Sequence, residues 1–178
     1  MYVGIDESNH GRFPEIFVAV FSTFDSDIEE RSFKKSRRNH KNLMRRLGRR
    51  SYSFLLYSSS DRKLFRERES YKEVGAIVAS LISPEILEQE DEKILDIYID
   101  GEHQHRTLVY CRDIVSNVLD IDKECVEVSC GPSLDEKLRI VNIADEIAHW
   151  LYRKQPLNDL ANKKQRRELL IPSIHFYL

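Results

Sequence analysis

The chain has 178 residues, a length that suits one domain, and 41% of them are hydrophobic, which is enough for a packed core. Its 28 basic and 30 acidic residues leave a formal net charge of -2, so overall charge neither requires nor excludes a nucleic-acid partner. Three cysteines without paired spacing argue against a disulfide framework or a zinc knuckle. Because no apolar run is long enough to span a membrane and no secretory leader is expected, we predict a cytoplasmic protein with no membrane partner.

The first part of the chain predicts three strands. Residues 2–6 form a short apolar run, residues 15–24 are β-branched and aromatic, and residues 51–57, SYSFLLY, make a plausible third strand. Between the last two lies a basic insert, residues 25–50, and its segment 31–50 holds ten Lys or Arg and no acid. Strands joined by tight or looped returns indicate an antiparallel meander.

The second part alternates helices and strands. Apolar residues at steps of three and four predict a helix from about residue 61 that ends before Pro84. A strand at 94–100, a helix from about 104 to 119 and a strand at 125–130 follow. The letters SLDE at 133–136 fit a capping box, with Ser133 as the cap and Glu136 reaching back, and predict a last helix from there to about residue 154.

This order predicts an α/β fold, because strands separated by helices are typical of parallel crossovers. We expect a mixed five-stranded sheet, with three antiparallel strands and then two parallel ones, flanked by helices. The whole chain, 1–178, would be a single domain with a C-terminal extension at 155–178. The apolar end of that extension could pack on a second copy of the chain, so a homodimer is one alternative.

Three acids stand where a carboxylate is costly. Asp6 ends the first strand, Asp100 ends the fourth, and Asp145 falls on the apolar stripe of the last helix. Converging buried carboxylates need a neutralising cation, and oxygen ligands of this kind suit Mg²⁺ or Mn²⁺. Two such ions can activate a water and stabilise the leaving oxygen in phosphodiester cleavage. Taken singly, each acid also fits a solvated turn or the rim of a helix.

Two motifs resemble those of the ribonuclease H-like superfamily. GIDES at 4–8 resembles the opening strand of type 2 ribonuclease H and of an uncharacterised Asp-Glu-Ser-motif group, domain of unknown function 3800. NIADEIAHWL at 142–151 resembles that group's helix with an Ala-Asp pair. The resemblance implies that the first and fourth strands are parallel neighbours, so that Asp6 and Asp100 lie side by side and Asp145 reaches them from the last helix. The turn after the acids reads SNHGRFP instead of the Gly-Lys/Arg-Gly-Pro of type 2 ribonuclease H, so specificity for RNA–DNA hybrids is not implied.

The fourth acid of such a site has more than one candidate. The resemblance favours Glu7, whereas a regular pleat turns Glu7 away from Asp6. Glu69 or Glu73 on the first helix is the alternative, placed as in type 1 members of the superfamily. Candidate accessory groups are Glu102 and His103, which follow Asp100, and His149, one turn after Asp145. These three also fit ordinary loop and packing roles.

The basic insert is the expected contact with a phosphate backbone. Its candidate residues are Lys34, Lys35, Arg37, Arg38, Lys41, Arg45, Arg46, Arg49 and Arg50. The alternative is a solvated arm that offsets the acidic connection at 85–92.

The sequence contains no Gly-x-Ser-x-Gly elbow, P-loop or dinucleotide-binding glycine motif. We therefore predict a divalent-metal-dependent nuclease that hydrolyses a phosphodiester of RNA, DNA or a hybrid. Asp6, Glu7, Asp100 and Asp145 would be catalytic, and Asp6, Asp100 and Asp145 would bind the metal. The alternatives are a non-catalytic nucleic-acid-binding or adaptor domain of the same fold and a metal-dependent enzyme for a small phosphorylated substrate.

Overall fold

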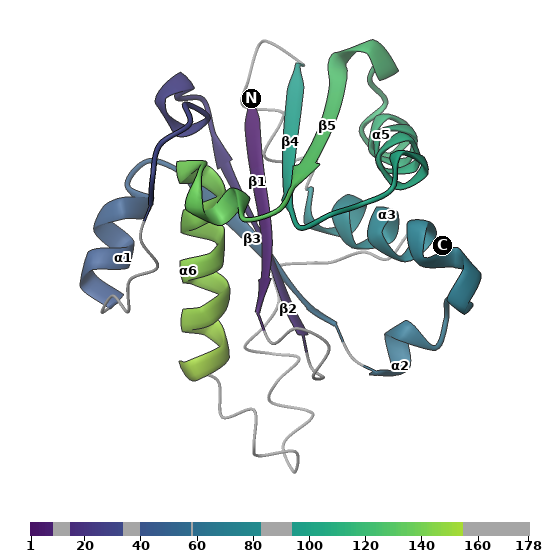
Figure 1. Cartoon of the computed structure of the whole chain (residues 1–178), viewed down its shortest axis with the longest axis horizontal. Helices are drawn as coiled ribbons and strands as arrows, with labels where there is room; N and C mark the ends of the chain where they lie inside the picture. Colours follow the sequence, from purple (N-terminus) through teal and green to yellow (C-terminus); the bar gives the residue numbers. More distant parts are fainter. Residues whose placement is uncertain (9–14, 34–39, 58, 83–93, 155–178) are drawn as a thin grey trace.

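A central five-stranded sheet organises the protein (Figure 1). The computed structural model describes residues 1–8, 15–33, 40–57, 59–82 and 94–154. The strand order is β3-β2-β1-β4-β5. The strands are β1 (Tyr2–Ser8), β2 (Glu15–Ser22), β3 (Ser51–Tyr57), β4 (Leu95–Asp100) and β5 (Val126–Gly131). β2 pairs antiparallel with β1 and β3, whereas β4 pairs parallel with β1 and β5, which confirms the predicted mixed sheet.

Helices cover both faces of the sheet (Figure 1). The helices are α1 (His40–Leu47), α2 (Ser59–Arg62), α3 (Ser70–Leu81), α5 (His105–Leu119) and α6 (Arg139–Lys154). The short 3-10 turns are η1 (Asp25–Asp27), η2 (Glu67–Glu69), η3 (Lys123–Cys125) and η4 (Leu134–Glu136). α3 and α5 pack on one face, and α1 and α6 pack on the other. Among the described helices, none is long and apolar enough to cross a membrane.

The alternation of side chains along the strands assigns each face its core. On β1, Val3 and Ile5 belong to the cluster under α3 and α5, while Val18 and its alternate neighbours on β2 belong to the cluster under α6. Gly4 lies directly beneath α6, because a Cβ there would stand 2.7 Å from the backbone of Ile140. The lack of a side chain at Gly4 therefore lets α6 rest on the central strand.

Several predicted boundaries are wrong. The first strand runs on to Ser8, so Asp6 and Glu7 lie within it, and the second ends at Ser22 rather than at residue 24. The helix expected from residue 61 begins at Ser70, and Leu64, which lies before that start, is 68% exposed.

The predicted capping box does not form either. Ser133 has a left-handed backbone (φ 57°) and caps η4 without a side-chain hydrogen bond, and α6 begins only at Arg139. The other predicted elements match within a residue or two. The expected extension at 155–178 lies outside the described residues.

Candidate metal centre

The end of β1 places Asp6 at an open edge of the sheet. β1 pairs with β2 as far as Ser8 but with β4 only as far as Ile5, which lies opposite Ile99. Asp6 is thus the first residue beyond the parallel pairing, and Asp100 is the next residue on β4. Because side chains alternate, both carboxylates belong to the face that carries α6, as the resemblance implies.

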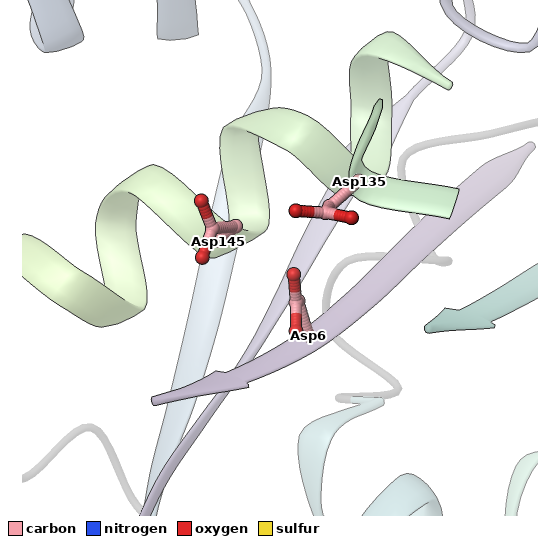
Figure 2. A group of neighbouring side chains, drawn as sticks. All are labelled: Asp6, Asp135 and Asp145. Atoms are coloured by element: carbon pink, nitrogen blue, oxygen red, sulfur yellow. The ribbon is translucent and has the colours of Figure 1, made fainter. Parts of the chain in front are cut away.

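Asp6 meets two further carboxylates on that face. Asp135 comes from η4 and Asp145 from α6, and the three carboxylates lie near one another (Figure 2). One carboxylate oxygen of each lies within 4.8 Å of the other two. Oxygens that share one Mg²⁺ at about 2.1 Å are at most about 4.2 Å apart, so small side-chain rotations would bring all three to one ion. We call Asp6, Asp135 and Asp145 the carboxylate triad.

Asp100 supports the triad from the neighbouring strand. Its Oδ1 accepts hydrogen bonds from the backbone N–H groups of Leu134 (2.6 Å) and Asp135 (3.3 Å). These bonds fasten η4 to the end of β4, and they fix the place from which Asp135 reaches Asp6. The structure thus brings Asp6 and Asp145 together as predicted, while the oxygen group of three contains Asp135 in place of Asp100.

The electrostatics of the triad favour a positive charge at its centre. Asp6 is only 7% exposed and Asp135 only 2%. Burial, followed by the nearby Asp145 carboxylate, raises the pKa of Asp6 to about 9, although the N–H of Glu7 donates a 2.6 Å hydrogen bond to its Oδ1. A group with this pKa retains its proton at neutral pH unless a cation replaces it. A divalent cation therefore fits these residues on both geometry and charge, and their all-oxygen donors suit Mg²⁺ or Mn²⁺.

Glu7 lies on the opposite face of β1, as the regular pleat requires. There it lines a cavity of about 450 Å³ with an apolar floor that includes Ile5 and Phe17. Asp6 and Asp100 also line this cavity, so the cavity reaches the sheet edge at which the triad lies.

The remaining predicted acids and histidines divide between this cavity and the surface. Glu73, Glu102 and His103 line the cavity, and Glu73 accepts a 2.6 Å hydrogen bond from the hydroxyl of Tyr57. Burial lowers the pKa of His103. Glu69 pairs with Lys72, and His149 is exposed on α6. The geometry therefore favours Glu73 over Glu69 as an acid near the sheet edge.

At the level of sequence, no family model and no curated protein matches this chain. Two archaeal structures are similar in three dimensions. The ribonuclease HII of Archaeoglobus fulgidus, solved in complex with PCNA, aligns over 96% of this chain and 78% of its own, with a TM-score of 0.52 and 16% identity. The ribonuclease H2 of Pyrococcus horikoshii aligns over 97% of this chain and 81% of its own, with a TM-score of 0.54 and 16% identity. The chain therefore has the ribonuclease H-like fold.

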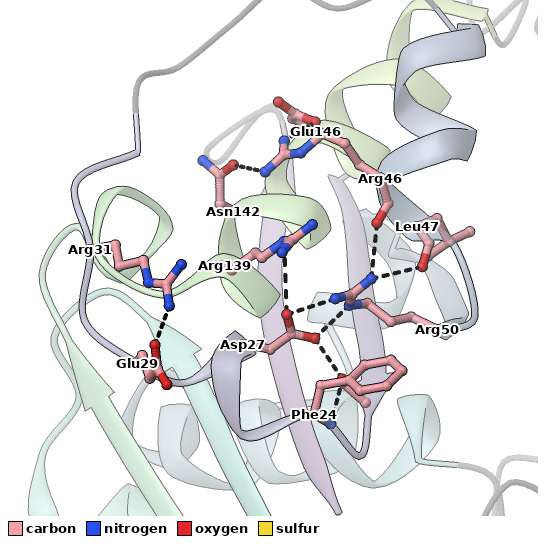
Figure 3. Close-up of polar contacts among 11 residues, drawn as sticks. Phe24, Asp27, Glu29, Arg31, Arg46, Leu47, Arg50, Arg139, Asn142 and Glu146 are labelled. Atoms are coloured by element: carbon pink, nitrogen blue, oxygen red, sulfur yellow. Dashed lines mark hydrogen bonds and ion pairs between the residues drawn. The ribbon is translucent and has the colours of Figure 1, made fainter.

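Two residues of the basic insert have partners inside this ribonuclease H-like fold (Figure 3). Arg46 forms an ion pair with Glu146, and Arg50 is bound to the buried Asp27, with a distance of 2.7 Å from Nη2 to Oδ1. Both arginine side chains are at most 10% exposed, so the structure gives them an internal role instead of the predicted contact with a phosphate backbone.

Three of the other predicted basic residues lie on or just after α1. Arg45 and Arg49 are exposed, and Lys41 lies on α1. Lys34, Lys35, Arg37 and Arg38 lie outside the described residues.

Asp135 is the residue that sequence reasoning missed. It stands inside the letters SLDE, which fit a capping box formed by Ser133 and Glu136 and assign no role to Asp135. One signal was available, because Gly131 and Pro132 break the chain directly after a strand and thereby favour a tight turn at its carboxyl end.

Proposed function

We propose that this protein is a divalent-metal-dependent nuclease that hydrolyses a phosphodiester bond of nucleic acid. The observation that carries the proposal is the carboxylate triad, which gathers three acids at the open end of β1 and β4 on a ribonuclease H-like sheet. The two similar structures are ribonucleases by name, which supports the same class of reaction here.

Each acid has a definite part in this proposal. Asp6, Asp135 and Asp145 would hold one cation, and Asp100 and Glu7 would complete the ligands on either side of the sheet edge. Bound divalent ions would supply the Lewis acid that activates a water and stabilises negative charge on the leaving oxygen. Asp6 must give up its proton when the cation binds, so binding should release protons at neutral pH.

The substrate would follow the positive charge that remains at the surface. Arg45 and Arg49 are exposed on and just after α1, and α1 packs beside α6, the helix that carries Asp145. A phosphate backbone that contacts α1 could therefore extend to the triad. Such contacts hold a strand without reading its bases.

The test is a cleavage assay with end-labelled RNA, DNA and RNA–DNA hybrid, in Mn²⁺, in Mg²⁺ and in EDTA. We expect cleavage of at least one substrate that requires the divalent ion. Asp6→Asn and Asp145→Asn should reduce the rate by at least about 100-fold, the scale expected when an electrostatic contributor to the transition state is lost.

Asp96→Asn is the matched control, because Asp96 lies on β4 at the end remote from Asp100 and pairs in register with Tyr2. It should leave the rate unchanged. Full activity in Asp6→Asn would contradict the proposal. Binding of all three nucleic acids in EDTA, with no cleavage in either metal, would favour the non-catalytic binding domain.

A further inference from the structure

The basic insert contacts the triad-bearing segment at several places, one of which is the ion pair of Asp27 with Arg139 of α6. Near its start, the backbone N–H of Arg31 donates to the carbonyl of Lys137 (2.9 Å), and that of Phe33 donates to the carbonyl of Glu136 (2.8 Å). Near its end, Leu43 and Leu47 of α1 pack in the same apolar cluster as α6. The insert therefore holds η4 and α6 from outside, whatever else it binds.

Arg46 makes a polar contact between α1 and α6 (Figure 3). Its side chain is 10% exposed, and its two terminal nitrogens have different partners. Nη1 forms the ion pair with the buried Glu146, and Nη2 donates a 2.8 Å hydrogen bond to Oδ1 of Asn142. Because a planar guanidinium fork fixes both partners at once, Arg46 sets the position of one full turn of α6.

Asn142 extends this contact to the triad. It is buried on α6, and while its Oδ1 accepts from Arg46, its Nδ2 donates a 2.7 Å hydrogen bond to the backbone carbonyl of Asp135. The turn of α6 between Asn142 and Glu146 also contains Asp145. One arginine thus connects to the backbone of one triad member and to the residue next to another.

We infer that Arg46 is a positioning residue, which fixes Asp135 relative to Asp145 so that their carboxylates and Asp6 can share one cation. This inference rests on the proposed function, because it assigns a role in the same metal centre. It separates Arg46 from the exposed arginines of the insert: they would face nucleic acid, whereas Arg46 acts on the protein's own carboxylates. Loss of a residue that orients metal ligands typically weakens metal binding by about 10- to 100-fold.

The experiment is calorimetric titration of Mn²⁺ into the full chain. Arg46→Gln should raise the Kd by about tenfold or more, and Arg46→Lys should fall between, because a single ammonium cannot reproduce the fork. Arg50→Gln is the matched control, since Arg50 is equally buried (8% exposed) and ion-paired, but with Asp27. It should lower the free energy of unfolding and leave the Kd within about twofold of the wild type.

A second variant guards against misfolding of the first. Arg46→Gln leaves the Glu146 carboxylate buried beside a neutral amide, which alone is destabilising. The double variant Arg46→Gln/Glu146→Gln removes that charge, so it should fold and still show the weakened Mn²⁺ binding. Circular dichroism would establish folding in both.

A metal-free measurement separates this inference from the proposed function. The N–H groups of Leu134 and Asp135 are bound to Asp100, and their hydrogen exchange reports how firmly η4 is held. Arg46→Gln should accelerate the exchange of these two N–H groups relative to the wild type, and adding EDTA or Mn²⁺ should not change that difference. Arg50→Gln should leave their exchange rates unchanged.

An unchanged Kd and unchanged exchange in Arg46→Gln would overturn the inference, and so would an equal loss of affinity in Arg50→Gln. Absence of Mn²⁺ binding in the wild type would overturn the proposed function, and the exchange comparison would still decide whether Arg46 positions Asp135.

Discussion

Replacing Asp6 by Asn should stabilise the metal-free protein while removing the proposed metal site. Asp6 is buried at the centre of three other acids, and its pKa is raised to about 9, by burial first and then by Asp145, with Asp100 and Asp135 adding to the effect. The folded protein therefore binds a proton at Asp6 that the unfolded chain, with an ordinary pKa of 3.8, has released.

The sign and size of the effect follow from proton linkage. With the folded pKa raised, the stability associated with Asp6 is fully present below about pH 4 and is lost as the pH rises toward 9. The loss is about 1.4 kcal/mol per pH unit, which amounts to about 4 kcal/mol by pH 7. An Asn side chain cannot ionise, so the variant should be free of this loss.

The assay is urea unfolding in EDTA at pH values from about 5 to 8, followed by circular dichroism. The difference in unfolding free energy between Asp6→Asn and the wild type should grow by about 1.4 kcal/mol per pH unit. Saturating Mn²⁺ should reverse the order, because only the wild type gains from binding. A difference that does not change with pH would refute this reasoning.

Three further outcomes test the packing and the charges. Gly4→Ala should lower the free energy of unfolding, measured in urea, by about 1–3 kcal/mol, because α6 leaves no room for a Cβ at that position. Gly131→Ala should change it little, because a Cβ there would make ordinary 3.5 Å contacts with Leu134. Equal effects of the two substitutions would contradict the tight packing at Gly4. Asp27→Ala should cost about 3–5 kcal/mol by leaving Arg50 buried without its carboxylate. Burial alone would raise the pKa of Asp27, but hydrogen bonds from Arg50 and Ser22 lower it. The contribution of Asp27 to the free energy of unfolding is therefore present above its ordinary pKa and is lost on acidification, which acid titration of the wild type and of Asp27→Ala would detect. The double variant Arg45→Gln/Arg49→Gln should reduce the slope of log affinity for duplex DNA against log salt by about 2, and an unchanged slope would remove these residues from the interface.

The fold was accessible from the sequence because its main signals are local. Short apolar and aromatic runs locate β3, β4 and β5 almost to the residue, steps of three and four locate α5, and the alternation of strands and helices gives the mixed sheet. The adjacency of β1 and β4, which the resemblance implies, then brings Asp6 and Asp100 to one edge. The place of Asp145 on an apolar stripe predicts that it faces the sheet, and the resemblance implies that it reaches Asp6 there.

What the sequence could not reveal depends on contacts between distant segments. The backbone at Ser133 departs from a helix cap where the Asp100 carboxylate binds the N–H groups of Leu134 and Asp135, and nothing in the letters SLDE encodes that partner. The arginines of the insert look alike by composition. Helical phase does distinguish Arg46 from the exposed arginines, because it lies between the buried Leu43 and Leu47. The acid with which it forms an ion pair, Glu146, lies on another helix and cannot be identified from this segment.

The order of the triad along the chain has a kinetic consequence. Asp6 belongs to the first strand, and Asp135 and Asp145 belong to the last two described elements, so the triad exists only once α6 has docked on β1. The sheet can therefore assemble without any repulsion among these acids, which arises only when α6 docks. If α6 docks after the folding transition state, a bound cation would leave the folding rate almost unchanged and would slow unfolding. The metal would then increase kinetic stability by slowing the release of α6 from the sheet.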